Sequence, residues 1–222
     1  MKGERMRQPS VEWSQTCDPV GHEAIATTPD VAPWGPVVLA STESRPGAKV
    51  LLAFRLLRAL AWLDPRWSVP PDESALTIHK SALGGPCLFL RGERGPSLSF
   101  SHGEGRLWAA MSGAGKVGID VAYPEEFTNC YPFARAFRAE ELECARALCP
   151  GHIGRGAALV WSAKEASVKA TGAGFNILDP LEVRVGNPSV TEQGILFEVS
   201  AGRRVSAWVR KEDHGWLSVA FA

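Results

Sequence analysis

The spacing of apolar residues changes along the chain and predicts both helices and strands. Residues 48–63 carry an apolar face at helical spacing, and Asp64-Pro65 ends it. Residues 97–123 read SLSFSHGEGRLWAAMSGAGKVGIDVAY, in which apolar and polar positions alternate between two glycine-rich turns. This alternation predicts an antiparallel meander, with VGIDV as its third strand and GAGK at 113–116 as the turn before it.

The second part of the chain continues with helices and then strands. We expect a helical stretch over about 132–148, a second helix over 160–175, and alternating runs near 181–186, 195–199, 204–210 and 216–221. Residues 1–35 hold few periodic signals and predict an irregular start, with a short strand in WGPVVLAS. This order favours an α+β fold with antiparallel sheets. The same order of elements suits two pseudo-symmetric halves, 1–114 and 115–222, with the active site at their interface.

Composition and charge narrow the classes of partner. The chain has 222 residues, 45% apolar and 22% charged, with 24 basic and 24 acidic side chains. A net charge of zero gives no reason to expect a nucleic-acid or membrane surface, so an anionic ligand must be met locally. The longest apolar run is interrupted by Arg55 and Arg58, and no signal peptide or membrane span is predicted.

The cysteines agree with a cytoplasmic protein. There are five, an odd number, without a CxxC pair or a His/Cys cluster. Neither a disulfide framework nor a zinc site is indicated, and reduced thiols are the plain interpretation.

The helix VWSAKEASVKATGAGF, residues 160–175, places a charge on its apolar side. Val160, Trp161 and Val168 gather on one stripe, and Lys164 falls inside it, although lysine is rarely buried without a partner. Glu165 and Lys169 are spaced for an i,i+4 pair, which by itself is as typical of a surface helix as of a site.

Two further segments offer candidate chemistry. In VGIDV, Asp120 shares a strand face with Gly118 and Ala122, so it has room for a ligand, although a solvated strand position is the simpler alternative. His102 follows SFS at a strand end, where either a turn histidine or a phosphate donor fits. GAGK lacks the GxxxxGK[ST] spacing of a phosphate loop, which favours the turn.

Taken in order, SLSFSHGEG, VGIDV, FRAEEL and WSAKEASVKATGAG resemble the motifs of the 4′-phosphopantetheinyl transferases, in particular the long, pseudo-dimeric class that activates nonribosomal peptide and polyketide synthases. LGGPCL and FRLLRAL resemble segments of the first half of that class. The resemblance spans about residues 45–180. It implies transfer of 4′-phosphopantetheine from coenzyme A to a serine of an apo acyl or peptidyl carrier protein, with release of 3′,5′-ADP.

The resemblance also implies roles for individual residues. Asp120 and Glu165 correspond to ligands of Mg²⁺, with Mn²⁺ as an alternative ion, and Glu165 to the proton acceptor. Lys164 and Lys169 are matched to coenzyme phosphates, with Lys169 and Asp120 also in the catalytic group.

Three further matches concern the coenzyme and the partner. Ser101 and His102 correspond to contacts with the 3′-phosphate, and Arg55 is expected as a second contact. Glu141, four residues after Phe137, is expected to be structural or to position substrate. The carrier protein is expected near residues 123–150, where exposed Phe127, Tyr131 and Phe133 would meet it. We expect a monomer.

Two residues depart from the family pattern. The acid usually found two residues after the strand aspartate is Ala122, which leaves that metal position to water; Glu125 or Glu126 could fold back, but Pro124 makes that route less direct. The usual lysine of the segment before the serine-histidine strand is Gly85, and Lys80 could replace it. Two alternatives remain: a non-catalytic relative that binds coenzyme A or a carrier protein, and an unrelated α+β nucleotide-binding domain.

Overall fold

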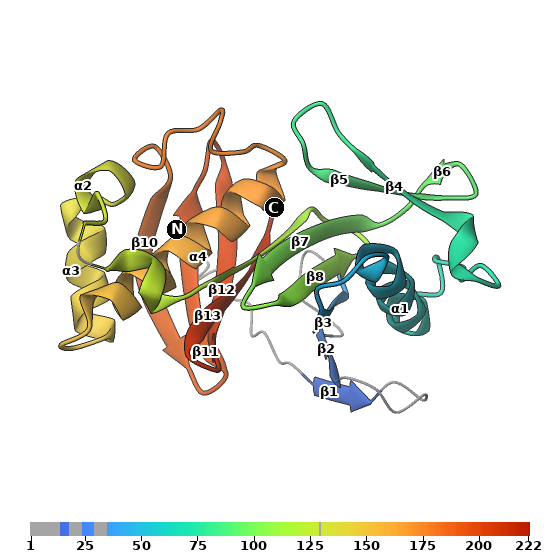
Figure 1. The fold of residues 1–222 in the computed structure, drawn as a ribbon, viewed down its shortest axis with the longest axis horizontal. Coiled ribbons are helices and arrows are strands. Elements are labelled where there is room, and N and C mark those ends of the chain that lie inside the picture. The colour runs from blue at the N-terminus through green and yellow to red at the C-terminus, as the bar shows by residue number, and fades with distance from the viewer. Residues whose placement is uncertain (1–13, 18–23, 29–34, 129) are drawn as a thin grey trace, which may run out of the picture.

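The computed structural model describes residues 14–17, 24–28, 35–128 and 130–222. Its strands form three antiparallel sheets, and each of the two larger sheets carries a long helix (Figure 1). The first sheet has the order β1-β2-β3-β8-β7, the second β10-β11-β12-β13-β9, and the small third sheet β4-β5-β6. This architecture agrees with the predicted α+β class.

The first sheet and the small sheet belong to the first half of the chain. Their strands are β1 (Ser14–Cys17), β2 (Ala24–Thr28), β3 (Val37–Glu43), β4 (Leu76–Lys80), β5 (Pro86–Leu90), β6 (Glu93–Arg94), β7 (Ser97–Gly103) and β8 (Arg106–Ser112). Helix α1 (Ala48–Leu63) has the predicted bounds and packs on β3 and β8, and a short turn η1 (Glu73–Ala75) precedes β4. Strand β1 pairs with β2, and β2 pairs with β3, so the prediction of an irregular start is wrong for these two segments. Backbone hydrogen bonds between strands do not need a strong apolar pattern in the sequence. The rest of residues 1–34 lies outside the described ranges.

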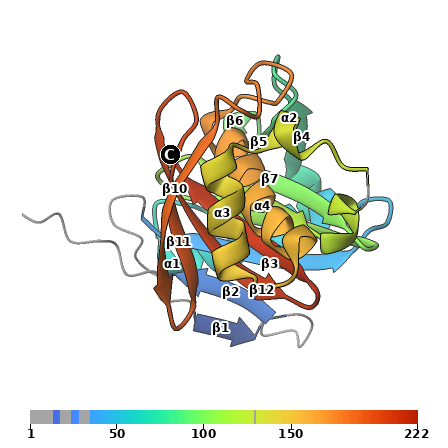
Figure 2. The ribbon, with the colours of Figure 1, turned by 90° about the vertical axis from the view of Figure 1, so that its left-hand side faces the viewer.

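The second sheet follows the helices of the second half. Its strands are β9 (Val117–Ala122), β10 (Arg184–Thr191), β11 (Gly194–Ser200), β12 (Arg204–Glu212) and β13 (Gly215–Phe221). The helices are η2 (Pro124–Phe127), α2 (Phe133–Ala136), α3 (Ala139–Leu148) and α4 (Ile153–Thr171). Helix α4 packs on β9 and β13, and α3 lies beside α4 on the side away from the first sheet (Figure 2). None of the described helices is long and apolar enough to cross a membrane.

The predicted meander is correct for two strands and wrong for the third. Strands β7 and β8 form a hairpin, but β9 pairs with β13 of the second sheet. The reason is that both edges of β8 are already occupied, by β3 and β7. The GAGK segment therefore connects two sheets, and the boundary proposed at residue 114 lies in that connection.

The remaining helix predictions need small changes. The stretch at 132–148 is broken at Phe137 and Arg138, which are extended, into α2 and α3. Helix α4 begins at Ile153, earlier than predicted, and ends at Thr171 because Gly172 adopts a left-handed φ of 79° and caps it. Three of the four alternating runs are confirmed as β11 to β13, with longer bounds, whereas the first run is displaced because β10 begins at Arg184 and continues to Thr191.

Two contacts join the sheets and fix β9. An apolar cluster between them takes Leu39 and Trp108 from the first sheet and Ile119 and Leu217 from the second. On β7, the hydroxyls of the three alternating serines accept hydrogen bonds from β9 N–H groups: Val117 to Ser97, Ile119 to Ser99 and Val121 to Ser101, at 3.1, 3.1 and 3.2 Å. The serine alternation therefore holds β9 beside β7 without a backbone ladder.

Candidate active site

Glycine at position 118 allows α4 to lie very close to β9. A Cβ atom at Gly118 would stand 1.9 Å from the Ala166 carbonyl oxygen, a distance that no side chain tolerates. Asp120 lies on this face of β9, as predicted from the strand period, and only 6% of it is exposed. The close approach brings Asp120 opposite the last turns of α4, so the interpretation of Asp120 as a solvated strand residue is excluded.

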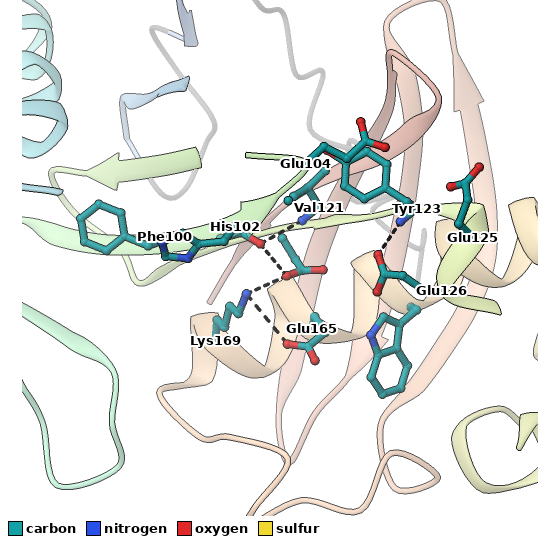
Figure 3. A pocket seen from close by; sticks show the side chains of 13 residues that line it. Phe100, His102, Glu104, Val121, Tyr123, Glu125, Glu126, Glu165 and Lys169 are labelled. Atoms are coloured by element: carbon teal, nitrogen blue, oxygen red, sulfur yellow. Dashed lines mark hydrogen bonds and ion pairs between the residues drawn. The ribbon is translucent and has the colours of Figure 1, made fainter. Parts of the chain in front are cut away.

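Asp120 and Lys169 form the centre of the candidate site. The Lys169 ammonium lies 2.7 Å from Asp120 Oδ1 and also donates to the Ile119 carbonyl. Figure 3 shows Lys169 beside Glu165. Its distance to Glu165 Oε2 is 3.9 Å, and that pair is the predicted i,i+4 pair on α4. The Ser101 hydroxyl donates to Asp120 Oδ1 at 2.9 Å. Residues from β7, β9 and α4 thus meet at one point.

Burial changes the acid–base properties of these groups. Burial raises the pKa of Asp120, against the lowering effects of Lys169 and Ser101. Burial, and then the Asp120 carboxylate, raises the pKa of Glu165 to about 7. His102 changes in the opposite direction, because burial and then the charges of Lys49 and Lys169 lower its pKa. At neutral pH the site therefore holds a carboxylate that can exchange a proton, beside a neutral imidazole.

Two cavities meet at these residues, and their charges are opposite. The first has a volume of about 590 Å³, and its acidic side chains are Glu104, Asp120, Glu125, Glu126 and Glu165. The second has a volume of about 1100 Å³, and its basic side chains are Arg45, Lys49, Lys80, Arg94, Lys116 and Lys169; the described residues that line it include no Asp or Glu. We call them the acidic cavity and the basic cavity. Phe100, His102 and Lys169 line both.

The predicted site residues divide into those brought together and those kept apart. Asp120, Glu165, Lys169, Ser101 and His102 all line the acidic cavity. Arg55, on α1, is not among the residues that line either cavity, and its predicted phosphate contact stays a prediction. Lys80 and Gly85 both line the basic cavity.

Lys164 is the buried lysine that its place in the apolar stripe predicted. It has no exposed surface, and its ammonium lies 2.7 Å from Glu141 Oε2. It also donates to the carbonyls of Ala136 and Pro180, at 3.0 and 2.9 Å. Glu141 completes its own bonds by accepting from the N–H groups of Arg138 and Val185. The pair joins α3, α4 and the approach to β10, which gives Glu141 the structural role that was expected.

Ser101 has a similar structural engagement. Its hydroxyl accepts from Val121 N–H and donates to Asp120, so both of these partners come from β9 and not from the open basic cavity. Of the aromatic residues expected on the carrier side, Phe127 is only 3% exposed, so that part of the prediction is wrong. Tyr131 and Phe133 are half-buried and pack on it or on each other.

Several lining residues were missed at the level of sequence. Lys49 lies in the first turn of α1, and Arg45 precedes that helix in a loop; neither belongs to a motif. Arg94 ends β6 and Lys116 lies in the β8–β9 connection, so the two come together only in the folded protein. These residues share only a positive charge and follow no regular spacing, so the sequence alone does not show that they line one cavity.

The acidic cavity suits a hard divalent cation. Its donors are carboxylate oxygens, and Lys169 is the one lysine or arginine among the described residues that line it. Within the described ranges, no three His, Cys, Asp or Glu side chains form a preassembled metal cage. Mg²⁺ does not require one, because it keeps several waters and takes phosphate oxygens beside one or two carboxylates. Asp120 and Glu165 would hold it.

Comparison with known proteins gave a family match for the second half of the chain. Residues 116–220 match the family model of the 4′-phosphopantetheinyl transferase superfamily. A search of curated proteins gave no match. The matched segment contains β9, α4 and the remaining strands of the second sheet, with Asp120, Glu165 and Lys169 among its residues. Residues 116–220, just under half of the chain, are therefore similar to the 4′-phosphopantetheinyl transferase superfamily.

Proposed function

We propose that this protein transfers the 4′-phosphopantetheine group of coenzyme A to a serine of an apo acyl or peptidyl carrier protein, and releases 3′,5′-ADP. The observation that supports this best is the pair of adjoining cavities of opposite charge with Lys169 at their junction. Coenzyme A carries a 3′-phosphate and a diphosphate, which suit a large cavity with six basic side chains and no acidic ones among its described lining. The reacting diphosphate would lie at the junction.

The residues of the junction would share the chemical step. The serine Oγ forms a bond to the β-phosphorus, the bond from that phosphorus to the bridging oxygen breaks, and 3′,5′-ADP leaves with that oxygen. Glu165 is proposed to accept the serine proton, directly or through a water of the bound cation, because its carboxylate lies at the junction beside Asp120 and Lys169. Bound Mg²⁺ would add positive charge beside the diphosphate oxygens. Lys169 offsets the charge that develops on the leaving phosphate.

The other predicted residues are proposed to bind the coenzyme, stabilise the fold or meet the carrier protein. His102 lies between the cavities and is proposed to contact the 3′-phosphate, with Lys49 beside it. Lys164 is proposed to stabilise the fold around α4, because a completely buried ammonium with three oxygen partners has no surface for a ligand. The carrier protein would approach the open acidic cavity from the side of Tyr131 and Phe133.

The test is transfer to a carrier protein followed by intact mass spectrometry. The protein is incubated with an apo carrier protein, coenzyme A and Mg²⁺, and we expect a mass gain of one phosphopantetheine on the acceptor serine. Asp120→Ala and Glu165→Gln, checked for folding, should each abolish the gain, because each removes a carboxylate from the reacting centre. A carrier protein with alanine in place of the serine is the matched substrate control.

The non-catalytic alternative predicts a different pattern. A relative that only binds would hold coenzyme A in a calorimetric titration and leave every apo carrier protein at its original mass. Absence of both binding and transfer would favour the unrelated nucleotide-binding domain. Transfer that persists at a normal rate in both acid variants would reject the assignment of the catalytic pair.

A further inference from the structure

Position 122 provides no carboxylate and no open space on the site face of β9. Ala122 is 1% exposed and belongs to the apolar cluster of the second half, together with Phe127 and Trp216. It shares a strand face with Asp120, so a longer side chain here would have to displace packed apolar groups. A third acidic group for the cavity must therefore come from another segment.

The turn that follows β9 brings an acidic residue, Glu126, back toward the acidic cavity. Pro124 begins η2, a position that favours proline because its missing N–H needs no partner there. At the end of the turn, Tyr123 N–H donates to Glu126 Oε1 at 2.8 Å, which closes a capping box. Phe127 is buried and its ring packs on Tyr131, with ring centroids 4.7 Å apart. Pro124 was expected to make the return of this segment less direct. In the structure it instead begins the turn that carries Glu126 back.

The capping bond directs Glu126 into the acidic cavity. Figure 3 shows Glu126 on the same side as Glu165, while its neighbour Glu125 points away from Glu165. Electrostatics agree with this placement: burial, and then the Asp120 and Glu125 charges, raise the pKa of Glu126. The charge of Glu126 in turn contributes to the raised pKa of Glu165.

The charge of this group calls for a cation. Asp120, Glu126 and Glu165 are three of the five acidic side chains that line the cavity, and Lys169 is the one lysine or arginine among its described lining residues. The lining therefore carries an excess of negative charge, which a bound divalent cation would reduce. Ionised groups of like sign in a partly buried cavity repel each other strongly unless such a counter-charge is present.

We infer that Glu126 is the third carboxylate of the divalent-cation site and occupies the role that Ala122 leaves open, an inference that rests on the proposed function for the place of the cation. Because the described residues form no preassembled three-ligand cage, Glu126 acts by accepting a hydrogen bond from a water of the hydrated cation. Carboxylates of this outer kind orient bound water and typically change metal affinity about 10-fold or more.

The experiment measures cation binding directly, on the full chain and without a carrier protein. Free Mn²⁺ is titrated by electron paramagnetic resonance against the wild type, Glu126→Gln and Glu125→Gln. Glutamine keeps a side-chain oxygen for the Tyr123 N–H, so Glu126→Gln removes the charge and leaves the cap in place. Glu125→Gln removes an equal charge from the neighbouring residue, whose side chain lines the same cavity but points away from Glu165. Thermal unfolding checks that both variants are folded.

We expect Glu126→Gln to weaken Mn²⁺ binding about 10-fold and Glu125→Gln by less than about 2-fold. Equal losses in the two variants would mean a general effect of charge and would overturn the inference, as would unchanged binding in Glu126→Gln. Asp120→Asn should remove Mn²⁺ binding; if it does not, the cation lies elsewhere and the inference is wrong. Because this readout needs no transfer, a protein that binds Mn²⁺ through Glu126 but modifies no carrier protein would reject the proposed function alone.

Discussion

Lys169 lies 2.7 Å from Asp120, at the line where a cavity rich in carboxylates adjoins a cavity rich in lysine and arginine. The Lys169 ammonium therefore contributes its positive charge to both the acidic cavity and the basic cavity. In the acidic cavity it offsets part of the repulsion between Asp120 and Glu165, and in the basic cavity it adds to the positive field. Its removal should affect a cation and an anion in opposite directions.

The first prediction concerns Lys169→Met. Loss of the ammonium should tighten Mn²⁺ binding and weaken coenzyme A binding, each by about 5-fold, since a charge a few ångströms away contributes about 1 kcal/mol when solvent screens it. Electron paramagnetic resonance measures the first quantity and calorimetry the second. Lys211→Met, on β12 and outside both cavities, is the control and should change neither. Two changes of the same sign would contradict a junction role.

The second prediction concerns the pH dependence of stability. The pKa of Glu165 is about 7 in the folded protein and about 4.5 in an unfolded chain, so on raising the pH the unfolded chain loses this proton first. Ionisation of Glu165 therefore lowers the stability of the folded state between these two values, and the loss is complete above pH 7. Glu165→Gln should be more stable than the wild type at pH 8, by about 2 kcal/mol, and should show no gain at or below pH 4.5.

Urea unfolding in the presence of a chelator measures this difference. Glu140→Gln, at an exposed position of α3, serves as the control and should show no such pH dependence. A variant less stable than the wild type at pH 8 would show that the Glu165 carboxylate is held favourably in the free protein, contrary to the raised pKa. Added Mg²⁺ should then stabilise the wild type more than Glu165→Gln, because binding to the folded state alone raises stability.

The third prediction concerns His102. Burial and the charges of Lys49 and Lys169 lower its pKa, so the imidazole is neutral at pH 7 in the free protein. A phosphate bound beside it would offset those lysines and raise the pKa. Titration of the imidazole signals by nuclear magnetic resonance should show this rise with coenzyme A and a smaller one with 3′-dephospho-coenzyme A. The signals of His214, which lies outside the basic cavity, serve as the control for effects that do not depend on the bound phosphate.

A binding comparison gives the same test without spectroscopy. His102→Ala should weaken coenzyme A more than 3′-dephospho-coenzyme A. Equal losses for the two ligands would mean that His102 does not contact the 3′-phosphate.

Local pattern was enough to predict most elements of the second half and the face of β9 that carries Asp120. Strand period placed Asp120 opposite Ile119, and helix period placed Lys164 in the apolar stripe, and both placements are confirmed. The partner of Lys164 was not predictable, because Glu141 lies 23 residues earlier in the chain and reaches Lys164 only when α3 packs on α4.

Pairing between distant strands was the main failure. Periodicity identified β9 as a strand but could not reveal that β13 is its neighbour, since the two lie almost a hundred residues apart. The basic cavity was missed for a related reason. Its lysines and arginines come from the start of α1, the end of β4, β6 and the β8–β9 connection, and no local spacing relates them.

The fourth prediction concerns the buried pair of Lys164 and Glu141. Lys164→Met leaves the Glu141 carboxylate buried without its ammonium partner at 2.7 Å, and should lower the free energy of unfolding by about 3–5 kcal/mol. Lys164→Met combined with Glu141→Gln should recover part of this loss, because glutamine carries no charge and keeps an oxygen acceptor. Urea unfolding measures both. A structural role also predicts that the folded fraction of Lys164→Met keeps its KM for coenzyme A; a KM raised about 10-fold would instead support a phosphate contact.

The last prediction uses two serines on one face of β7. Ser99 and Ser101 each accept a β9 N–H, from Ile119 and Val121, and each is almost fully buried. Replacement of either by alanine leaves a buried N–H without an acceptor, so both variants should lose about 1–3 kcal/mol of stability.

Ser101 differs in one respect: its hydroxyl also donates to Asp120 and lowers the pKa of that carboxyl. Ser101→Ala should therefore raise the pKa of Asp120 and increase the Mg²⁺ concentration needed for half-maximal transfer, more at lower pH than at higher pH, whereas Ser99→Ala should leave that concentration unchanged. Steady-state rates at pH 6.5 and pH 8 across a range of Mg²⁺ separate the two. A higher KM for coenzyme A in Ser101→Ala, with the Mg²⁺ requirement unaltered, would show instead that Ser101 reaches the coenzyme itself, because a hydroxyl that served only β9 and Asp120 could not change coenzyme affinity alone.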